Sequence, residues 1–120
     1  MTFVYNLVLF LHFLGMALLI GGFFAQMGAT PRTVSHWMRD GALTQLVTGL
    51  ALAGLAGSGV GTDSTFSPAA VGTKLAIATV VTIIVLAGAR EPAEKQQPFW
   101  AAAGALALVN VAVAVFWLTA

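Results

Sequence analysis

The segment from Phe3 to Met27 constrains this chain more than any other feature. Its 25 residues contain no Asp, Glu, Lys or Arg, and as an α-helix they would extend about 37 Å, beyond the ~30 Å hydrocarbon core of a bilayer. The whole chain has the same character, since 59% of its residues are hydrophobic and only 8% are charged, whereas about 25% of residues are charged in soluble domains. The sequence therefore predicts an integral membrane protein.

With 120 residues, the chain has room for four helices of this kind and short connections. Segments rich in proline, glycine or charge interrupt the apolar sequence three times, and these segments are expected to be loops. We expect an all-α fold, an integral membrane four-helix bundle forming a single domain over residues 1–120. The predicted helices cover about residues 3–27, 35–58, 69–90 and 99–119.

Basic residues in the predicted loops indicate the orientation of the chain. Arg32 and Arg39 lie in or beside the first loop, and Arg90 and Lys95 lie in the third, whereas the second loop and both termini have no basic residue. Because cytoplasmic loops carry an excess of Lys and Arg, we expect both termini on the outer side. The expected location is the cell membrane, as a multi-pass protein of the bacterial inner membrane type. Lys74 then lies at the outer end of the third helix.

His12 is the main candidate for a functional residue, because it is the one ionisable side chain well inside the first helix. A neutral imidazole is a good axial ligand for haem iron. Met16 follows one turn later on the same helix and cannot reach the opposite axial face, so a haem would be five-coordinate or ligated by two copies of His12. The alternative is that His12 makes a packing hydrogen bond to Asn110 or a threonine.

Three further residues are candidates for binding a cofactor. Lys74 could attract a propionate, a lipid phosphate or a quinone oxygen, although it could also reach the headgroups and pair with Asp63. Asn110 lies near the middle of the fourth helix, and Tyr5 shares a helix face with His12. We expect Gln45 and Thr48 to be satisfied within the bundle, without a functional role. No catalytic residue emerges from the sequence.

Three segments of the chain resemble a superfamily of small four-helix membrane proteins. These are LHFLGMALLIGG from residue 11, RDGALTQLVTGLALAG from residue 39 and GTKLAIATVVTIIVLAG from residue 72. The superfamily includes the CopD copper-resistance domain, the uncharacterised DUF2269 proteins and the HemJ type of protoporphyrinogen oxidase. The matching positions are His12, Gly21, Gly22, Arg39, Thr48, Gly49 and Lys74.

This resemblance implies a four-helix bundle and, in the HemJ branch, a b-type haem with catalysis on a porphyrin. It implies that His12 matches the haem histidine and metal ligand, and that Lys74 matches a conserved lysine. The chain is shorter than HemJ proteins and lacks their additional histidines, tryptophans and arginines. It also lacks the outer-loop methionine and histidine of CopD.

Two functions of different classes follow. The first is a small redox-associated membrane protein whose bundle binds haem b, or a quinone as the weaker alternative, through His12 and Lys74. The second is a non-catalytic accessory subunit packed against a larger membrane complex, such as a respiratory one. A proton-coupled transporter ranks third. The expected partners are the lipid bilayer and other membrane subunits or a second copy of the chain, and a net charge of +1 does not suggest nucleic acid.

Overall fold

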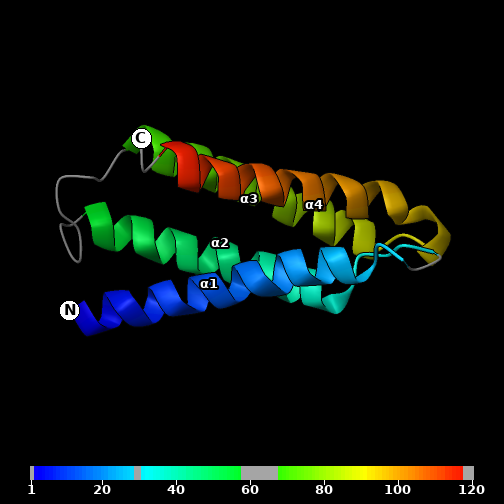
Figure 1. Ribbon diagram of the computed structural model, residues 1–120, viewed down its shortest axis with the longest axis horizontal. Helices are drawn as coiled ribbons and strands as arrows, with labels where there is room; N and C mark the ends of the chain where they lie inside the picture. Colours follow the sequence, from blue (N-terminus) through cyan, green and yellow to red (C-terminus); the bar gives the residue numbers. More distant parts are fainter. Residues whose placement is uncertain (1, 29–30, 58–67, 118–120) are drawn as a thin grey trace.

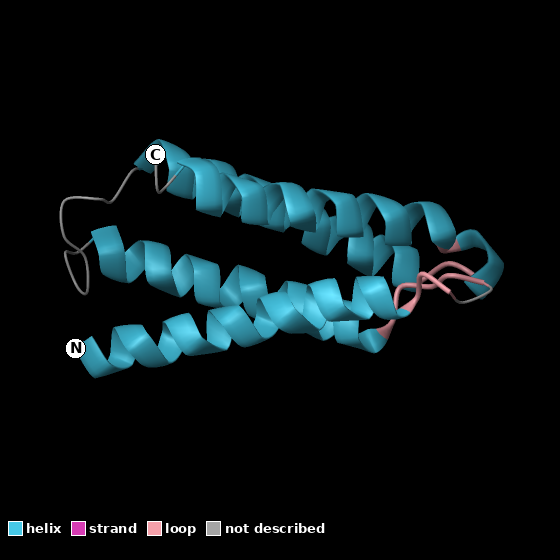
Figure 2. Cartoon of the chain, in the orientation of Figure 1, coloured by secondary structure: helices cyan, strands magenta, loops and turns pink. Residues whose placement is uncertain are grey.

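The computed structural model describes residues 2–28, 31–57 and 68–117 of the chain. Every regular element in these ranges is helical, which confirms the predicted all-α class (Figure 2). Along the chain the elements are α1 (Thr2–Ala25), α2 (His36–Gly57), α3 (Pro68–Ala89), the short 3-10 helix η1 (Ala93–Lys95), α4 (Gln97–Ala112) and the π-helix η2 (Val113–Trp117).

The four long helices run alternately up and down in one elongated bundle (Figure 1). The bundle measures 46 × 26 × 21 Å. Residues 26–28 and 31–35, which connect α1 to α2, lie together with residues 90–96 at one end, which we call the closed end (Figure 1). The start of α1 and the end of η2 lie at the opposite end, which we call the open end.

The helix limits fall within two residues of those predicted, except at the end of the fourth helix. α1 ends at Ala25, where the N–H of Gln26 bonds to the carbonyl of Phe23 at 3.2 Å in a turn. α4 begins at Gln97, before the predicted start, because Pro98 is well suited to the first turn of a helix. The predicted fourth helix is not α-helical throughout, since it widens into a π-helix at Val113.

Glycines bring α1 and α2 into close contact. A Cβ atom on Gly41 would lie 2.5 Å from the backbone nitrogen of Leu19 and 2.7 Å from the carbonyl oxygen of Gly15. A Cβ on Gly15 would lie 3.1 Å from the backbone nitrogen of Gln45, and one on Gly22 would lie 3.2 Å from that of Met38. Gly15 and Gly22 on α1 thus admit the α2 backbone, and Gly41 supplies the complementary position on α2.

The buried core occupies only part of the bundle's length. Its apolar members, all at the closed end or near the middle, are Leu19, Phe23, Val34, Met38, Ala42, Val81, Val85, Trp100, Ala103 and Ala107. Within the described ranges, no side chain is fully buried in α1 before Gly15, in α2 after Thr48, in α3 before Val81 or beyond Asn110. The open half of the bundle is therefore loosely packed.

Polar contacts hold the helices and connections together at the closed end. The Trp100 indole donates a hydrogen bond to the Phe23 carbonyl at 3.0 Å, and the two rings stack with their centroids 4.6 Å apart. The buried Gln96 side chain accepts from the Val34 N–H at 2.8 Å and donates to the Glu91 carbonyl at 2.7 Å. The Trp100 ring is 6% exposed and lies inside the bundle.

Three helical segments are long and apolar enough to cross a membrane: Phe3–Ala25, Val71–Ala89 and Gln97–Phe116. α2 is also long enough, with 22 residues, but it is less apolar and is not among these segments. It carries Arg39 and Asp40 near its start and the buried polar residues Gln45 and Thr48 further along.

Candidate functional site

His12 forms a hydrogen bond across the α1–α2 interface. Its Nδ1 lies 2.8 Å from the hydroxyl oxygen of Thr48. Thr48 is buried, and its hydroxyl in turn donates to the carbonyl of Thr44, one turn earlier on α2, at 2.6 Å. The close approach at Gly15 and Gly41 makes this contact possible, because it brings the α1 backbone against α2 within one turn of His12.

The direction of these bonds fixes the tautomer of the imidazole. A threonine hydroxyl has one proton, and Thr48 directs it at Thr44. Thr48 can therefore only accept from His12, so Nδ1 of the imidazole carries a hydrogen. In the neutral ring the other nitrogen, Nε2, then carries no hydrogen, and its lone pair can accept a hydrogen bond. Nε2 has no hydrogen-bond partner within the described part of the chain.

Lys74 lies on α3, and its neighbour Leu75 lies beside Gly49, as His12 does. A Cβ on Gly49 would lie 3.5 Å from Cε1 of His12 and 3.4 Å from Cδ2 of Leu75. Three helices thus meet around the imidazole. Lys74 has no carboxylate partner among residues 2–28, 31–57 and 68–117, and Asp63, its predicted partner, lies outside the described residues.

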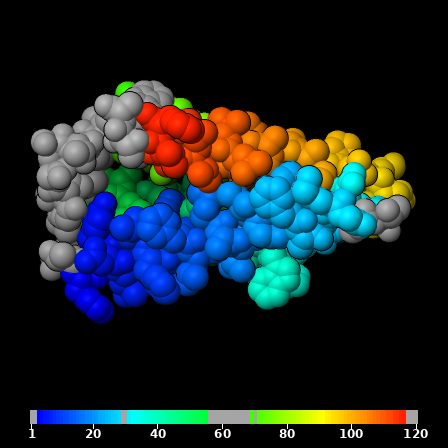
Figure 3. Space-filling model, in the orientation of Figure 1, coloured from blue at the N-terminus to red at the C-terminus, as the bar shows by residue number. Residues whose placement is uncertain are grey.

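This site lies where the packed half of the bundle gives way to the loosely packed half. His12 and Lys74 are both half-buried, whereas Thr48 beside them is buried. Figure 3 shows part of α2 in a hollow between the N-terminal half of α1 and η2.

The structure separates the other two predicted binding residues from this group. Tyr5 is half-buried, two helical turns before His12 on α1. Asn110 is buried on α4, and its carboxamide faces a cavity on the far side of Met16. Of the packing partners considered for His12, a threonine is the one observed, and Asn110 is not.

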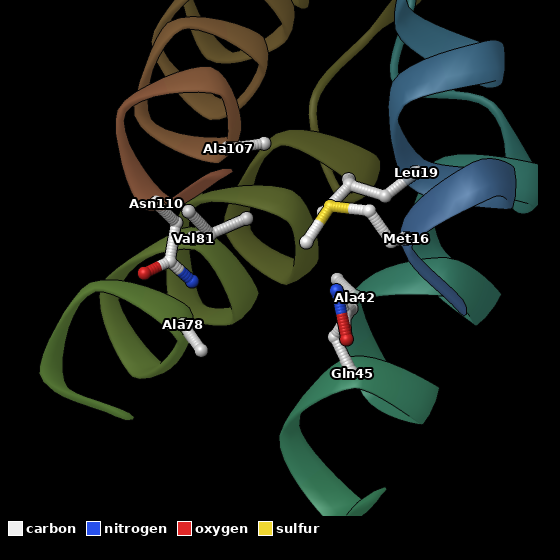
Figure 4. A pocket seen from close by; sticks show the side chains of 8 residues that line it. All are labelled: Met16, Leu19, Ala42, Gln45, Ala78, Val81, Ala107 and Asn110. Atoms are coloured by element: carbon white, nitrogen blue, oxygen red, sulfur yellow. The ribbon is translucent and has the colours of Figure 1, made fainter. Parts of the chain in front are cut away.

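Gln45 and Thr48 were both expected to be satisfied within the bundle, and the structure confirms this for Thr48, which bonds to His12 and Thr44. Gln45 differs, because it lines the same cavity as Asn110 and its buried carboxamide oxygen has no partner among the described residues. Each of the four helices contributes two residues to the lining of this cavity, which has a volume of about 10 Å³ (Figure 4). The spacing of Thr48 and Thr44, one turn apart on α2, was the available signal in the sequence for the hydrogen bonding of Thr48. Nothing in the sequence distinguished Gln45.

The donor set around His12 fits haem only in part. A hydroxyl that accepts from Nδ1 is a typical support for a metal-ligating histidine, and the Lys74 ammonium suits a propionate. No described methionine supplies a second axial ligand: Met16 lines the Asn110 cavity, Met38 is in the core at the closed end, and Met27 lies exposed just beyond the end of α1. The described ranges also contain no group of three or more His, Cys, Asp or Glu that could hold a metal ion.

Comparison with known proteins adds no assignment. No protein-family model, curated protein or solved structure matches the chain.

Proposed function

We propose that this chain is a multi-pass membrane protein of the cell membrane, whose four helices all cross the bilayer with both termini on the outer side. Three helices have the required length and hydropathy, and the polar residues Gln45 and Thr48 in the middle of α2 are buried against its neighbours. Arg32, Arg90 and Lys95 lie in the connections at the closed end, which is then cytoplasmic.

Because the chain has no cysteine, single cysteines can report this orientation directly. A membrane-impermeant maleimide applied to intact cells should label Thr2→Cys and leave Glu94→Cys unlabelled until the cells are opened. Labelling of Glu94→Cys but not of Thr2→Cys in intact cells would show the opposite orientation and refute the proposed one.

Within this bundle, the open half binds a hydrophobic ligand whose polar head carries a carbonyl or hydroxyl group, and a quinone is the class that fits best. The observation that carries this proposal is the chain of bonds from His12 to Thr48 to Thr44, which leaves Nε2 of the imidazole as an acceptor. Nε2 can accept from a quinol hydroxyl, and the Lys74 ammonium can donate to a quinone carbonyl. The apolar tail of the ligand would lie in the loosely packed half of the bundle.

Haem b is the second candidate. It would use the same Nε2 lone pair as its single protein ligand from this chain, with Lys74 near a propionate. The quinone is preferred because it requires hydrogen-bonding groups on two helices, which His12 and Lys74 supply, and no second axial ligand. The superfamily resemblance, with its porphyrin chemistry in one branch, remains a proposal on the same residues.

The test is a titration of the detergent-purified protein with a short-chain ubiquinone analogue, followed by quenching of tryptophan fluorescence. Saturable quenching is expected for the wild type and is expected to be lost in His12→Ala and in Lys74→Met. Thr48→Val removes one orienting hydrogen bond, worth about 0.5–1.5 kcal/mol, and should weaken binding about 2- to 10-fold. Thr79→Val is the matched control, because the Thr79 hydroxyl is exposed and bonds only to the Leu75 carbonyl of its own helix.

Equal binding by the wild type, His12→Ala and Lys74→Met would refute the site. A Soret band and an α-band in the purified wild type, absent from His12→Ala, would identify haem instead of a quinone.

A non-catalytic accessory subunit is the alternative function. It is favoured by the His12–Thr48 bond, because an interhelical hydrogen bond of this kind can serve packing alone. The lipid-facing side of α1 is also rich in exposed aromatic rings, among them Phe3, Phe10 and Phe13. This alternative predicts no quinone or haem binding and co-purification of a larger membrane complex in mild detergent.

A further inference from the structure

Gly49 on α2 differs from the other glycines whose surroundings the structure describes. The others either face a neighbouring segment so closely that an added Cβ would lie within 2.9 Å of another atom, as at Gly41, or have nothing within 4 Å of it, as at Gly54. At Gly49 the nearest atoms would be Cδ2 of Leu75 at 3.4 Å and Cε1 of His12 at 3.5 Å, which are ordinary contact distances. A methyl group therefore fits at this position, between α1 and α3.

Neither packing nor helix formation accounts for a glycine here. Gly49 is half-buried in the interior of α2. Glycine is less favourable than alanine inside a helix, because it loses more conformational freedom on folding. A methyl group at this place would gain contacts with His12 and Leu75 without a clash. The glycine instead leaves a methyl-sized space where α1, α2 and α3 meet, next to the imidazole.

This space borders the nitrogen that the proposed ligand would use. Cε1 of His12 is bonded to both ring nitrogens, and Nδ1 is already engaged by the Thr48 hydroxyl at 2.8 Å. Thr48 and Gly49 are consecutive on α2, so the helix holds the imidazole through one residue and leaves room beside it through the next. A methyl group against Cε1 would lie beside Nε2 and narrow the approach of a head group to its lone pair.

We propose that Gly49 is a specificity-determining residue of the ligand site, where the absent side chain admits a substituted ring against the imidazole. This inference rests on the proposed quinone site. Both hydroxyls of a ubiquinol ring are flanked by methoxy or alkyl groups, which need space next to the oxygen that donates to Nε2. Gly49 provides that space, whereas a side chain at this position would favour rings with hydrogens beside the hydroxyl.

The test compares two quinols that share a decyl tail and differ in the ring. Decylubiquinol is fully substituted, whereas decylhydroquinone has one hydroxyl with hydrogens on both sides. Anaerobic calorimetric titration of the detergent-purified protein should show that Gly49→Ala weakens decylubiquinol binding about 10-fold and decylhydroquinone binding much less. The melting temperature of Gly49→Ala should equal that of the wild type or rise by a few degrees, because alanine is the better helix former.

Gly54→Ala is the matched control on the same helix, and both affinities should remain those of the wild type. Equal affinities of Gly49→Ala and the wild type for decylubiquinol would overturn the inference, as would an equal loss for both quinols. A lower melting temperature of Gly49→Ala would overturn it too, because packing would then require the glycine.

His12→Ala separates this inference from the proposed function. If the wild type binds decylubiquinol, His12→Ala does not, and Gly49→Ala binds as the wild type does, the quinone site stands and the role of Gly49 is refuted. If the wild type binds neither quinol, the quinone site and the role of Gly49 are refuted together.

Discussion

Replacing Gly41 by alanine tests how the α1–α2 interface positions the candidate site. The added Cβ would lie 2.5 Å from the backbone nitrogen of Leu19 and 2.7 Å from the carbonyl oxygen of Gly15. Ordinary contact begins at 3.4 Å, so the two helices must separate by about 1 Å, a gap that forfeits a quarter to a half of the dispersion energy of the contacts it opens. These atoms belong to the backbone of α1 and cannot rotate away.

Separation of the two helices should lower both the stability of the protein and its affinity for the ligand. Overpacking of this sort destabilises proteins by about 1–3 kcal/mol, and the better helix propensity of alanine returns only about 0.5–1 kcal/mol. We therefore expect a net loss of about 1–2 kcal/mol. The same movement stretches the His12–Thr48 hydrogen bond, now 2.8 Å, so that quinone affinity falls together with stability.

The free energy of unfolding can be measured by reversible denaturation with sodium dodecyl sulfate in mixed micelles, followed by circular dichroism. Gly54→Ala is the matched control on the same helix, because a Cβ on Gly54 would meet nothing within 4 Å. It should be as stable as the wild type or slightly more so. Equal stability of Gly41→Ala and Gly54→Ala would refute the close packing of these helices.

Two further predictions concern the closed end. Gln96→Leu leaves the N–H of Val34 and the carbonyl of Glu91 without their side-chain partner and should lower the free energy of unfolding by about 1–3 kcal/mol in the same titration, whereas the exposed neighbour Gln97→Leu should change little. Trp100→Phe keeps a ring for stacking on Phe23 but removes the indole hydrogen bond, so a loss of about 1 kcal/mol is expected, smaller than that of Trp100→Ala. No loss in Trp100→Phe would show that this hydrogen bond does not stabilise the closed end.

Much of the fold was predictable because apolar runs and loop residues mark it directly. Residues 3–27 contain no Asp, Glu, Lys or Arg, and α1 occupies almost all of them. The structure shows which face of α3 is buried: Val81 and Val85 are buried, whereas Val80 and Ile83 are exposed. Hydrophobicity could not decide this, because all four side chains are apolar.

The candidate site was predictable only in part. His12 stood out because an ionisable residue inside an apolar helix is rare, and Lys74 stood out for the same reason. Their convergence depends on how three helices pack, which no local pattern encodes. The contrasting roles of Thr48 and Asn110 depend on the rotation of α2 and α4 about their axes, since a turn of the helix decides whether a polar side chain meets His12 or the internal cavity.

The most direct measurement is the ¹⁵N chemical shift of the two ring nitrogens of His12 in the labelled protein, with His36→Gln used to assign the signals. A protonated Nδ1 and an unprotonated, pyridine-type Nε2 are predicted, and the Nε2 signal should shift when the short-chain quinone analogue is added. A protonated Nε2 with a bare Nδ1 would contradict the account, because His12 would then have no lone pair to offer a ligand.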